Sequence, residues 1–288
     1  MIICVSMYAS LPGMLLTRDG HRSHSKAMTG QDTPLSPARD AGTLIVVRPR
    51  AGDGLPELLM TRRADTLRFA GGAMVFPGGA IDAGDRALAE ELGGAVASVD
   101  MAARIAAIRE TIEECGLALT GMGQALARGP AEALRQALHR GEGLGPLIRA
   151  GGLRFNFEGL VPFARWCPRA WETRIRYDTR FYLATVEGGH DDLVPDGSET
   201  ASLLWSSARD MLARADAGEA RIIFPTRCNL ERLAQFDTVD ALIGHARMQP
   251  VDLISPWLEM RDGEEHICIP EESGYPVTAR PASLALRG

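Results

Sequence analysis

Short runs of apolar and β-branched residues, separated by turns rich in glycine, proline and polar residues, recur along the chain from residue 43 onward. Such runs are typical of β-strands. They predict strands at Thr43–Arg48, Leu58–Arg62, within Phe69–Ala80, and at Leu160–Trp166, Arg176–Val186 and Ala201–Trp205. A loop is expected between Ala80 and Asp100. Because helical patterns alternate with these runs, the sequence predicts an α/β (α+β) fold with a mixed sheet.

The clearest helical pattern runs from about Asp100, an expected N-cap, to Cys115, where Gly116 should end the helix. Its apolar side chains are spaced three, four and three residues apart, which predicts one buried stripe. The stripe consists of Ile105, Ile108, Ile112 and Cys115. Further helical patterns occur within Gly121–Gly159, from Ser207, at Thr226–Ala234 and at Asp237–Met248, before a β-rich tail that ends near Ile269.

These patterns divide the chain into three parts. Residues 1–40 are expected to form a disordered tail, because residues 21–40 are rich in Ser, Thr, Pro and His, and Met28 is a plausible alternative start. Residues 41–210 are expected to form the main domain, with insertions near 86–99 and 121–159. Residues 211–288 are expected to form a helical and β-rich extension packed on that domain.

Composition and charge narrow the class of protein. The chain has 288 residues, is 45% hydrophobic and carries a net charge of -6, which fits a soluble globular protein and argues against a nucleic-acid coat. Its longest uncharged run, Ile2–Leu16, is too short to span a membrane. The five cysteines occur singly, so no zinc site or disulfide framework is indicated. We therefore expect a cytoplasmic protein without nucleic-acid or membrane partners.

Three glutamates lie opposite the buried stripe of the 100–115 helix. Glu110, Glu113 and Glu114 follow one another at i, i+3 and i+4, so their charges repel one another. A solvated acidic face is one interpretation. The other is a cation site, since carboxylate oxygens are suited to Mg²⁺ or Mn²⁺ held against substrate phosphates.

The residues around these glutamates favour the cation site. The segment Arg109–Leu117 reproduces the second half of the Nudix box, G-x5-E-x7-R-E-U-x-E-E-x-G-U, and Phe76–Gly79 with Asp85 resembles its first half. The chain thus resembles the Nudix hydrolases. Two departures are that Asp85 replaces the usual glutamate, and that 23 residues instead of 7 separate it from Arg109. Such an interrupted box resembles the Nudix motif 19-like branch, which contains coenzyme A diphosphatases.

This resemblance implies a fold and a set of site residues. The fold would be a Nudix α/β/α sandwich with helical insertions and a C-terminal extension. Glu110, Glu113, Glu114 and the backbone carbonyl of Gly78 would bind Mg²⁺ or Mn²⁺, and Arg109 would orient the helix carboxylates. Either Glu114 or Glu199, which lies six residues before Trp205, would act as general base.

A second resemblance concerns the substrate. The segment Leu59–Gly79 is similar to a coenzyme A signature, which it matches at Arg68 and Gly72 among others and from which it departs at Met60 and Arg63. It implies hydrolysis of coenzyme A or acyl-coenzyme A to 3′,5′-ADP and (acyl-)4′-phosphopantetheine. The same box would suit an NADH or ADP-ribose diphosphatase, or a Nudix-fold sensor that binds without cleaving.

Several residues are candidates for binding such a substrate. A guanidinium fork matches phosphate geometry, although an arginine in this arginine-rich chain can equally be a surface residue. The substrate-binding candidates are Arg62, Arg68, Phe76 and Arg180, with Arg63, Arg174 and Arg176 as further arginines. His190, His245 and Cys115 are expected to be surface or packing residues. The partner would be a small nucleotide-linked diphosphate, and a homodimer stays open.

Overall fold

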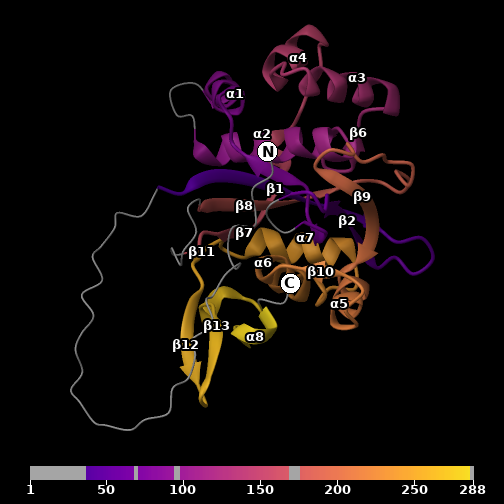
Figure 1. The fold of residues 1–288 in the computed structure, drawn as a ribbon. Coiled ribbons are helices and arrows are strands. Elements are labelled where there is room, and N and C mark those ends of the chain that lie inside the picture. Colours follow the sequence, from indigo (N-terminus) through magenta and orange to yellow (C-terminus); the bar gives the residue numbers. More distant parts are fainter. Residues whose placement is uncertain (1–36, 68–70, 94–97, 169–175, 286–288) are drawn as a thin grey trace.

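A mixed β-sheet lies between two layers of helices (Figure 1). The computed structural model describes residues 37–67, 71–93, 98–168 and 176–285. Most of the expected tail at 1–40 lies outside these residues, but its last two residues, Arg39 and Asp40, already belong to the first strand. The α/β class and the three-layer arrangement expected from the sequence are confirmed.

In the described part of the chain, nine strands form the main sheet. Seven of them follow the order β10-β3-β2-β1-β8-β7-β11, while β4 also pairs with β1 and β9 with β2. The strands are β1 (Arg39–Pro49), β2 (Pro56–Arg63), β3 (Ala73–Val75), β4 (Gly78–Ala80), β7 (Val161–Trp166), β8 (Tyr177–Thr185), β9 (Thr200–Ser207), β10 (Arg221–Ile222) and β11 (Leu253–Ile254). Two smaller sheets pair β5 (Leu119–Gly121) with β6 (Gln124–Ala125), and β12 (Trp257–Arg261) with β13 (Glu264–Cys268) and β14 (Ala279–Pro281).

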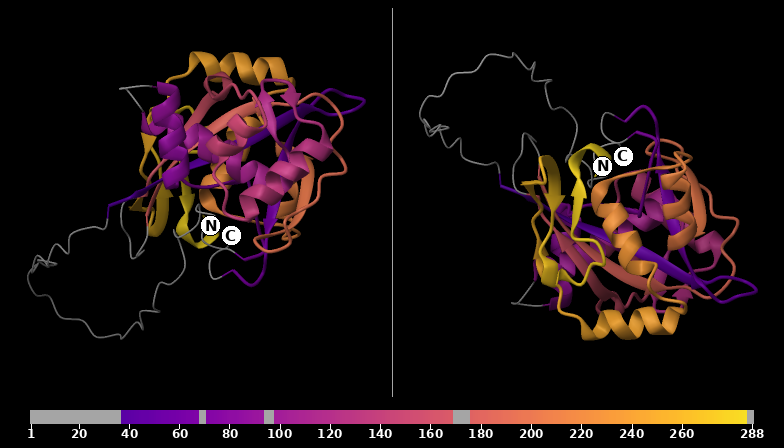
Figure 2. Two further views of the ribbon diagram at one scale, coloured as in Figure 1. Left: turned by 90° about the horizontal axis from the view of Figure 1, so that it is seen from above. Right: turned by 90° about the horizontal axis from the view of Figure 1, so that it is seen from below.

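The helices cover both faces of the main sheet, as the views from above and below show (Figure 2). One layer contains α1 (Ala83–Gly93), α2 (Val99–Cys115), α3 (Arg128–His139) and α4 (Leu144–Ala150), with the short 3-10 helix η2 (Phe157–Gly159). The other contains α5 (Ala208–Asp216), α6 (Phe224–Leu233) and α7 (Val239–Met248). The C-terminal segment adds the 3-10 helix η3 (Glu271–Ser273) and α8 (Ala282–Ala285).

Strand β1 separates two hydrophobic cores because its side chains alternate between the faces of the sheet. Leu44 and Val46 belong to the α2-side core, and Ile45 and Val47 belong to the α6-side core; all four are fully buried. The α2-side core also contains Leu59, Ile105, Ile108, Ile112, Cys115, Leu134, Leu138, Leu144, Tyr182 and Ala184. The α6-side core also contains Met60, Phe76, Phe163, Trp166, Phe181, Leu183, Phe224, Leu230, Leu233, Leu242 and Tyr275.

Helix α2 begins two residues before the position expected from the sequence. Its N-cap is Ser98, whose hydroxyl accepts a hydrogen bond from the Met101 N–H (3.1 Å), whereas Asp100 lies in the first turn and pairs with Arg104 (2.7 Å). The other end is as predicted, since Gly116 has a φ of 70° and its N–H donates to the Ile112 carbonyl (2.9 Å). A glycine suits this left-handed cap because it carries no Cβ.

Glycine at position 42 allows α2 to lie directly on β1. A Cβ added at Gly42 would lie 1.9 Å from the carbonyl oxygen of Ala103. The facing residues of α2 are also small, including the buried Ala103 and Ala107. Helix α2, which carries the Nudix-box glutamates, therefore packs so close to β1 that only small residues fit between them.

The prediction of a loop between Ala80 and Asp100 was wrong, because residues 83–93 form helix α1. Asp82 and Asp85 start this helix by reciprocal capping: the Asp85 N–H donates to the Asp82 carboxylate (2.7 Å), and the Asp82 N–H donates to the Asp85 carboxylate (2.9 Å). The glycines at 84 and 93 obscured this short helix in the sequence. Residues 121–159, expected to form an insertion, carry helices as predicted, namely α3 and α4.

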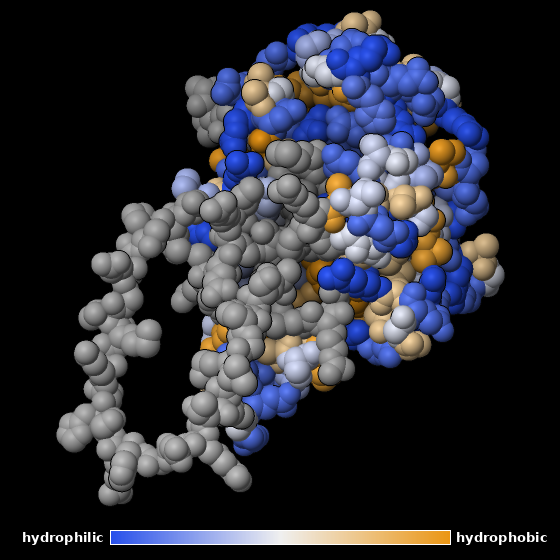
Figure 3. Space-filling view, in the orientation of Figure 1, coloured by the Kyte–Doolittle hydropathy of each residue, from blue (hydrophilic) through white to orange (hydrophobic). Residues whose placement is uncertain are grey.

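The C-terminal extension contributes to the main sheet as well as covering it. Strand β10 pairs with β3, and β11 pairs with β7. In the described residues, no helix combines the length and the apolar character needed to cross a membrane. Where coloured residues are visible in Figure 3, hydrophilic ones predominate over the α1–α4 layer, and hydrophobic ones form small scattered patches.

Candidate active site

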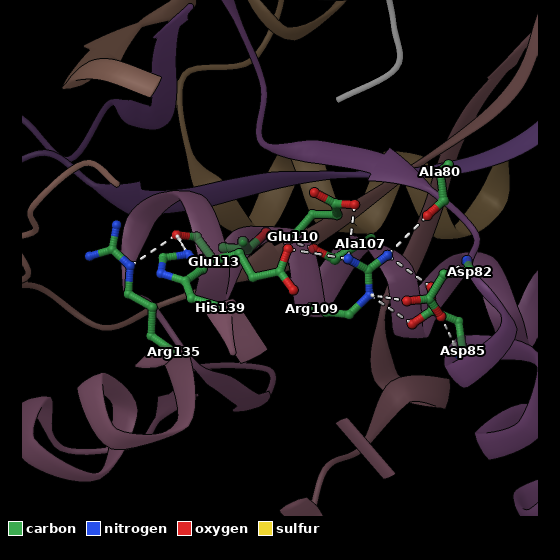
Figure 4. A network of polar contacts seen from close by, with 10 residues as sticks. Ala80, Asp82, Asp85, Ala107, Arg109, Glu110, Glu113, Arg135 and His139 are labelled. Atoms are coloured by element: carbon green, nitrogen blue, oxygen red, sulfur yellow. Dashed lines mark hydrogen bonds and ion pairs between the residues drawn. The ribbon is translucent and has the colours of Figure 1, made fainter. Parts of the chain in front are cut away.

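Arg109 lies at the centre of a buried polar network on α2 (Figure 4). Its Nη1 donates to Glu110 (2.9 Å) and to Glu113 (3.3 Å), while Nε and Nη2 form a pair of bonds to Asp85 (3.0 and 2.9 Å). The second Nη2 hydrogen goes to the Ala80 carbonyl (2.9 Å). A guanidinium has five N–H donors, and all five are used here. The arginine is 7% exposed, so the network fixes it and aligns the two glutamates.

The interrupted motif is closed in space by helix α1. Asp85 lies in its first turn and is 1% exposed. Because the capping contact with Asp82 brings this turn beside α2, the shorter aspartate reaches Arg109 directly. The 23 residues between Asp85 and Arg109 hold the rest of α1 and the first turns of α2, so the interruption leaves the ion pair intact.

Gly79 provides the space that Glu110 occupies. A Cβ at Gly79 would lie 2.1 to 2.7 Å from the three atoms of the Glu110 carboxyl group. Glu110 is 3% exposed, and burial raises its pKa to about 7, against the opposing charge of Arg109. Strand β4 contains Gly78 and Gly79 and pairs with residues 41–43 of β1. The backbone carbonyl of Gly78 therefore lies on the strand that faces Glu110 of α2.

Glu114 is buried without a hydrogen-bond partner. It is 3% exposed, and neither carboxylate oxygen has a partner among the residues that the structure describes. Burial raises its pKa well above the usual range; the carboxylates of Glu110, Glu199 and Asp196 raise it further, and Arg63 opposes them. A buried carboxyl group that faces other carboxylates is neutralised either by a proton, which the raised pKa favours, or by a bound cation.

Glu199 is brought to this place by a tight turn. The Asp196 carboxylate accepts hydrogen bonds from the backbone N–H groups of Glu199 (2.9 Å) and Thr200 (2.7 Å). The Asp196 N–H in turn donates to the carbonyl of Glu114 (3.2 Å), which joins the turn to the end of α2. The Glu199 carbonyl accepts from the Ala64 N–H (2.8 Å), so the residue is also held against the end of β2.

Trp205 anchors the other end of the loop that carries Glu199. Its indole N–H donates to the His190 carbonyl (2.9 Å), and the Arg48 guanidinium stacks 4.1 Å from the centre of its ring. Arg48 also pairs with Asp191 (2.7 Å). The spacing between Glu199 and Trp205 therefore has a structural basis, because Glu199 lies at the end of the loop before β9 and Trp205 of β9 holds that loop at His190.

The donor set fits a hard divalent cation. Among the described residues, no three acidic, histidine or cysteine side chains already converge as a metal cluster. Arg109 occupies one oxygen each of Glu110 and Glu113. The remaining oxygens of these residues and both oxygens of Glu114 are of the type that Mg²⁺ and Mn²⁺ prefer.

The structure disperses the predicted substrate-binding arginines. Arg62 pairs with Asp65 (2.7 Å), and Arg180 pairs with Asp40 (3.0 Å). Arg63 is 4% exposed and lies close enough to affect the Glu114 carboxyl group. Arg68 and Arg174 lie outside the described residues, and Arg176 is partly buried directly before β8.

The structure also places Phe76 and the three residues that were expected to have surface or packing roles, which are Cys115, His190 and His245. Phe76 is 3% exposed in the α6-side core, which is a packing position, so its proposed contact with substrate stays a prediction. Cys115 is fully buried, and burial raises the pKa of its thiol well above the usual range. The His245 ring packs against Phe236 (4.9 Å), and His190 adopts a φ of 63° in the loop.

Two residues of the site were missed from the sequence. Asp82 caps α1, and Asp196 shapes the turn before Glu199. Both are followed within four residues by the groups that they hold, in the pattern of a capping box and of an Asx turn. These local patterns were the sequence signals from which Asp82 and Asp196 could have been identified.

Comparisons with known proteins agree with the geometry. No protein-family model matches the chain. The chain is 28% identical over 283 residues to the acyl-coenzyme A diphosphatase NUDT19 of Gallus gallus, covering 76% of this chain and 74% of that protein. It is 31% identical over 186 residues to the putative nudix hydrolase 7 of Caenorhabditis elegans, covering 62% of this chain and 56% of that protein.

A solved structure extends the likeness to the fold. The crystal structure of a Nudix hydrolase from Alicyclobacillus acidocaldarius is 32% identical in sequence, superposes with a TM-score of 0.63, and is matched over 75% of this chain and 99% of its own. With the Arg109 network and the buried glutamates of α2, this similarity establishes that the chain belongs to the Nudix hydrolase family.

Proposed function

We propose that the protein hydrolyses the diphosphate of coenzyme A or acyl-coenzyme A in a reaction that requires Mg²⁺ or Mn²⁺. One P–O bond of the diphosphate breaks, the oxygen of water bonds to that phosphorus, and the products are 3′,5′-ADP and (acyl-)4′-phosphopantetheine. The observation that carries the proposal is Glu114, a fully buried carboxylate with no hydrogen-bond partner among the described residues, beside Glu110 and Glu199. The likeness to the acyl-coenzyme A diphosphatase of Gallus gallus supports the choice of substrate.

The proposed metal ligands are Glu110, Glu113, Glu114 and the carbonyl of Gly78. The chemistry that such an ion supplies when bound is neutralisation of charge on the diphosphate oxygens and activation of a water molecule. Arg109 engages one oxygen each of Glu110 and Glu113 and leaves the other oxygen of each free of this arginine.

Proton removal from the attacking water is assigned to Glu114 or Glu199. Burial and neighbouring negative charge favour the protonated form of Glu114, which suits a carboxylate that has to accept a proton. Glu199 is the alternative, because its turn is bonded to the backbone of Glu114 and its charge acts on the Glu114 carboxyl group.

Substrate recognition is assigned to Arg62, Arg68, Phe76 and Arg180. Arg62 and Arg180 are each paired with an aspartate, so a phosphate would have to replace Asp65 or Asp40 as the partner. The cytoplasmic location and the homodimer expected from the sequence stay predictions.

The test is an activity assay with product identification. The purified protein is incubated with Mg²⁺ or Mn²⁺ and with coenzyme A, acyl-coenzyme A, NADH or ADP-ribose, and the products are identified by mass. We expect 3′,5′-ADP and (acyl-)4′-phosphopantetheine. Formation of AMP from NADH without cleavage of coenzyme A would contradict the substrate assignment, and saturable binding without turnover of any compound would indicate a sensor.

A pair of matched variants distinguishes a loss of activity at the site from a general effect of replacing a glutamate by glutamine. Glu114→Gln should lower kcat by at least about 100-fold, the usual contribution of a general base or a metal ligand. Glu90→Gln, an equivalent change on the exposed face of α1, should leave kcat unchanged. Equal activity of both variants would remove Glu114 from the mechanism.

A further inference from the structure

The carboxyl end of α2 is held by an arginine from the 121–159 insertion. Arg135 of α3 donates from Nε to the Glu113 carbonyl (2.9 Å) and from Nη2 to the Glu114 carbonyl (3.4 Å). The ring nitrogen Nε2 of His139, one turn further along α3, lies 3.1 Å from the same Glu113 oxygen. Figure 4 shows both side chains converging on that carbonyl. The last carbonyls of a helix lack partners within the helix, so these contacts satisfy them.

The same guanidinium reaches the loop that carries Glu199. We call residues 186–199, between β8 and β9, the 186–199 loop. Arg135 Nη1 donates to the Val194 carbonyl in this loop (2.9 Å). Arg135 is 5% exposed as a residue and therefore bridges two segments in a buried position. One residue thus binds the backbone of both proposed metal ligands at the end of α2 and the segment that leads to Glu199.

Packing between these segments is incomplete beside Arg135. A cavity of about 230 Å³ lies between the end of α2, α3 and the 186–199 loop, and Arg135 is part of its wall. Its lining includes Cys115, Leu117, Leu126, Leu193 and Val194. Because side chains around a cavity have fewer partners, the polar bridge carries more of the contact between helix and loop than it would in a filled core.

We propose that Arg135 is a positioning residue for the hydrolytic site, and that this is a role of the 121–159 insertion. It sets the separation between Glu113 and Glu114 on α2 and Glu199 on the loop. This inference rests on the proposed function for its catalytic part. It predicts that loss of Arg135 weakens metal binding and turnover while affinity for the substrate changes little.

The experiment compares Arg135→Ala, Arg135→Lys and Arg140→Ala with the wild-type protein. Arg140 follows directly after α3 and pairs with Glu142 on the surface, so it is the matched control. Mn²⁺ binding is measured without substrate by electron paramagnetic resonance, and kcat and KM are measured with coenzyme A. For Arg135→Ala we expect the Mn²⁺ dissociation constant to rise and kcat to fall, each by about tenfold or more, with KM within about twofold. Arg140→Ala should match the wild type.

Arg135→Lys keeps the charge but cannot reach three carbonyls at once, so it should fold and give intermediate values. It decides the question if Arg135→Ala does not fold. Wild-type Mn²⁺ binding and kcat in a folded Arg135 variant would overturn the inference, even if its Tm is lower. If the wild-type protein does not cleave coenzyme A, the proposed substrate fails, whereas the Mn²⁺ measurement still tests Arg135.

Discussion

Arg109 and Glu114 lie five residues apart on one helix and have opposite hydrogen-bonding states. Arg109 uses all five of its donors, whereas the Glu114 carboxylate has no partner among the described residues. The first arrangement is complete in the protein alone. The second is incomplete. Because burying a carboxyl group without a hydrogen-bond partner costs free energy, we infer that a cation bound at Glu114 stabilises the folded protein.

Replacing Glu114 by glutamine should stabilise the metal-free protein at neutral pH. Because burial raises its pKa, the Glu114 side chain has to take up a proton on folding at neutral pH, which costs free energy. The amide is similar in size and needs no proton, so we expect a gain of at least about 1 kcal/mol, or about 2–4 °C in Tm. Added Mg²⁺ should raise the Tm of the wild-type protein and not that of the variant. Thermal unfolding with chelator and with Mg²⁺ measures both effects. A variant less stable than the wild type without metal would refute the interpretation.

Gly79→Ala tests the space next to Glu110. The added Cβ would overlap the Glu110 carboxyl group, the flexible end of a side chain, and φ at Gly79 is not in the left-handed region. We therefore expect the Glu110 carboxyl group to shift against Arg109, at a smaller cost in stability than a clash with backbone would cause, with a loss of Mn²⁺ affinity and kcat of about tenfold or more. Unchanged Mn²⁺ affinity would show that the position of Glu110 does not matter for the metal.

At the scale of elements, α2 is positioned from three sides. Gly42 lets it touch β1, Asp85 joins it to α1, and Arg135 joins it to α3 and the 186–199 loop. The functional residues of α2 are therefore fixed relative to the sheet by elements that are distant in sequence. A change in one of these contacts should affect the whole helix rather than one side chain.

Gly42→Ala tests the contact between α2 and β1. Unlike the change at Gly79, its Cβ would meet backbone, the Ala103 carbonyl at 1.9 Å, and backbone in the middle of a helix cannot yield. We expect a loss of at least about 3 kcal/mol in the free energy of unfolding, measured by urea denaturation. Gly79→Ala serves as the control, since Gly42 and Gly79 are paired residues of β1 and β4. Equal stability of both variants would contradict the argument.

Elements with a strong local pattern were predictable from the sequence. The buried stripe and Gly116 predicted α2, and the β-rich runs predicted the central strands. Helix α1 was missed because its signal is the capping pair of Asp82 and Asp85 rather than apolar periodicity. The motif indicated Arg109 and the glutamates, and an Asx-turn pattern was the only local signal for Asp196. Arg135 acts through backbone carbonyls of distant segments, which no sequence pattern specifies.

For the whole molecule, the C-terminal extension is part of the fold rather than an addition to it. Of the 28 buried residues in the α6-side core, 14 lie beyond Asp216. The buried Tyr275 hydroxyl donates to Asn229 (2.7 Å) and accepts from the Trp166 indole (3.1 Å), which joins the tail, α6 and β7. The shared hydrophobic core and the hydrogen bonds of Tyr275 therefore join the extension to strands of the main sheet.

A chain that ends at Asp216 should consequently fail to fold. It would lack β10, β11, α6 and α7, and would expose one face of the main sheet, including Phe163 and Trp166. The hydrophobic area lost is far larger than a marginally stable domain tolerates. We expect no cooperative thermal transition, strong binding of a hydrophobic dye and no metal-dependent hydrolysis, each measured against the full chain. A cooperative transition in the shortened chain would show that residues 41–210 form an independent domain.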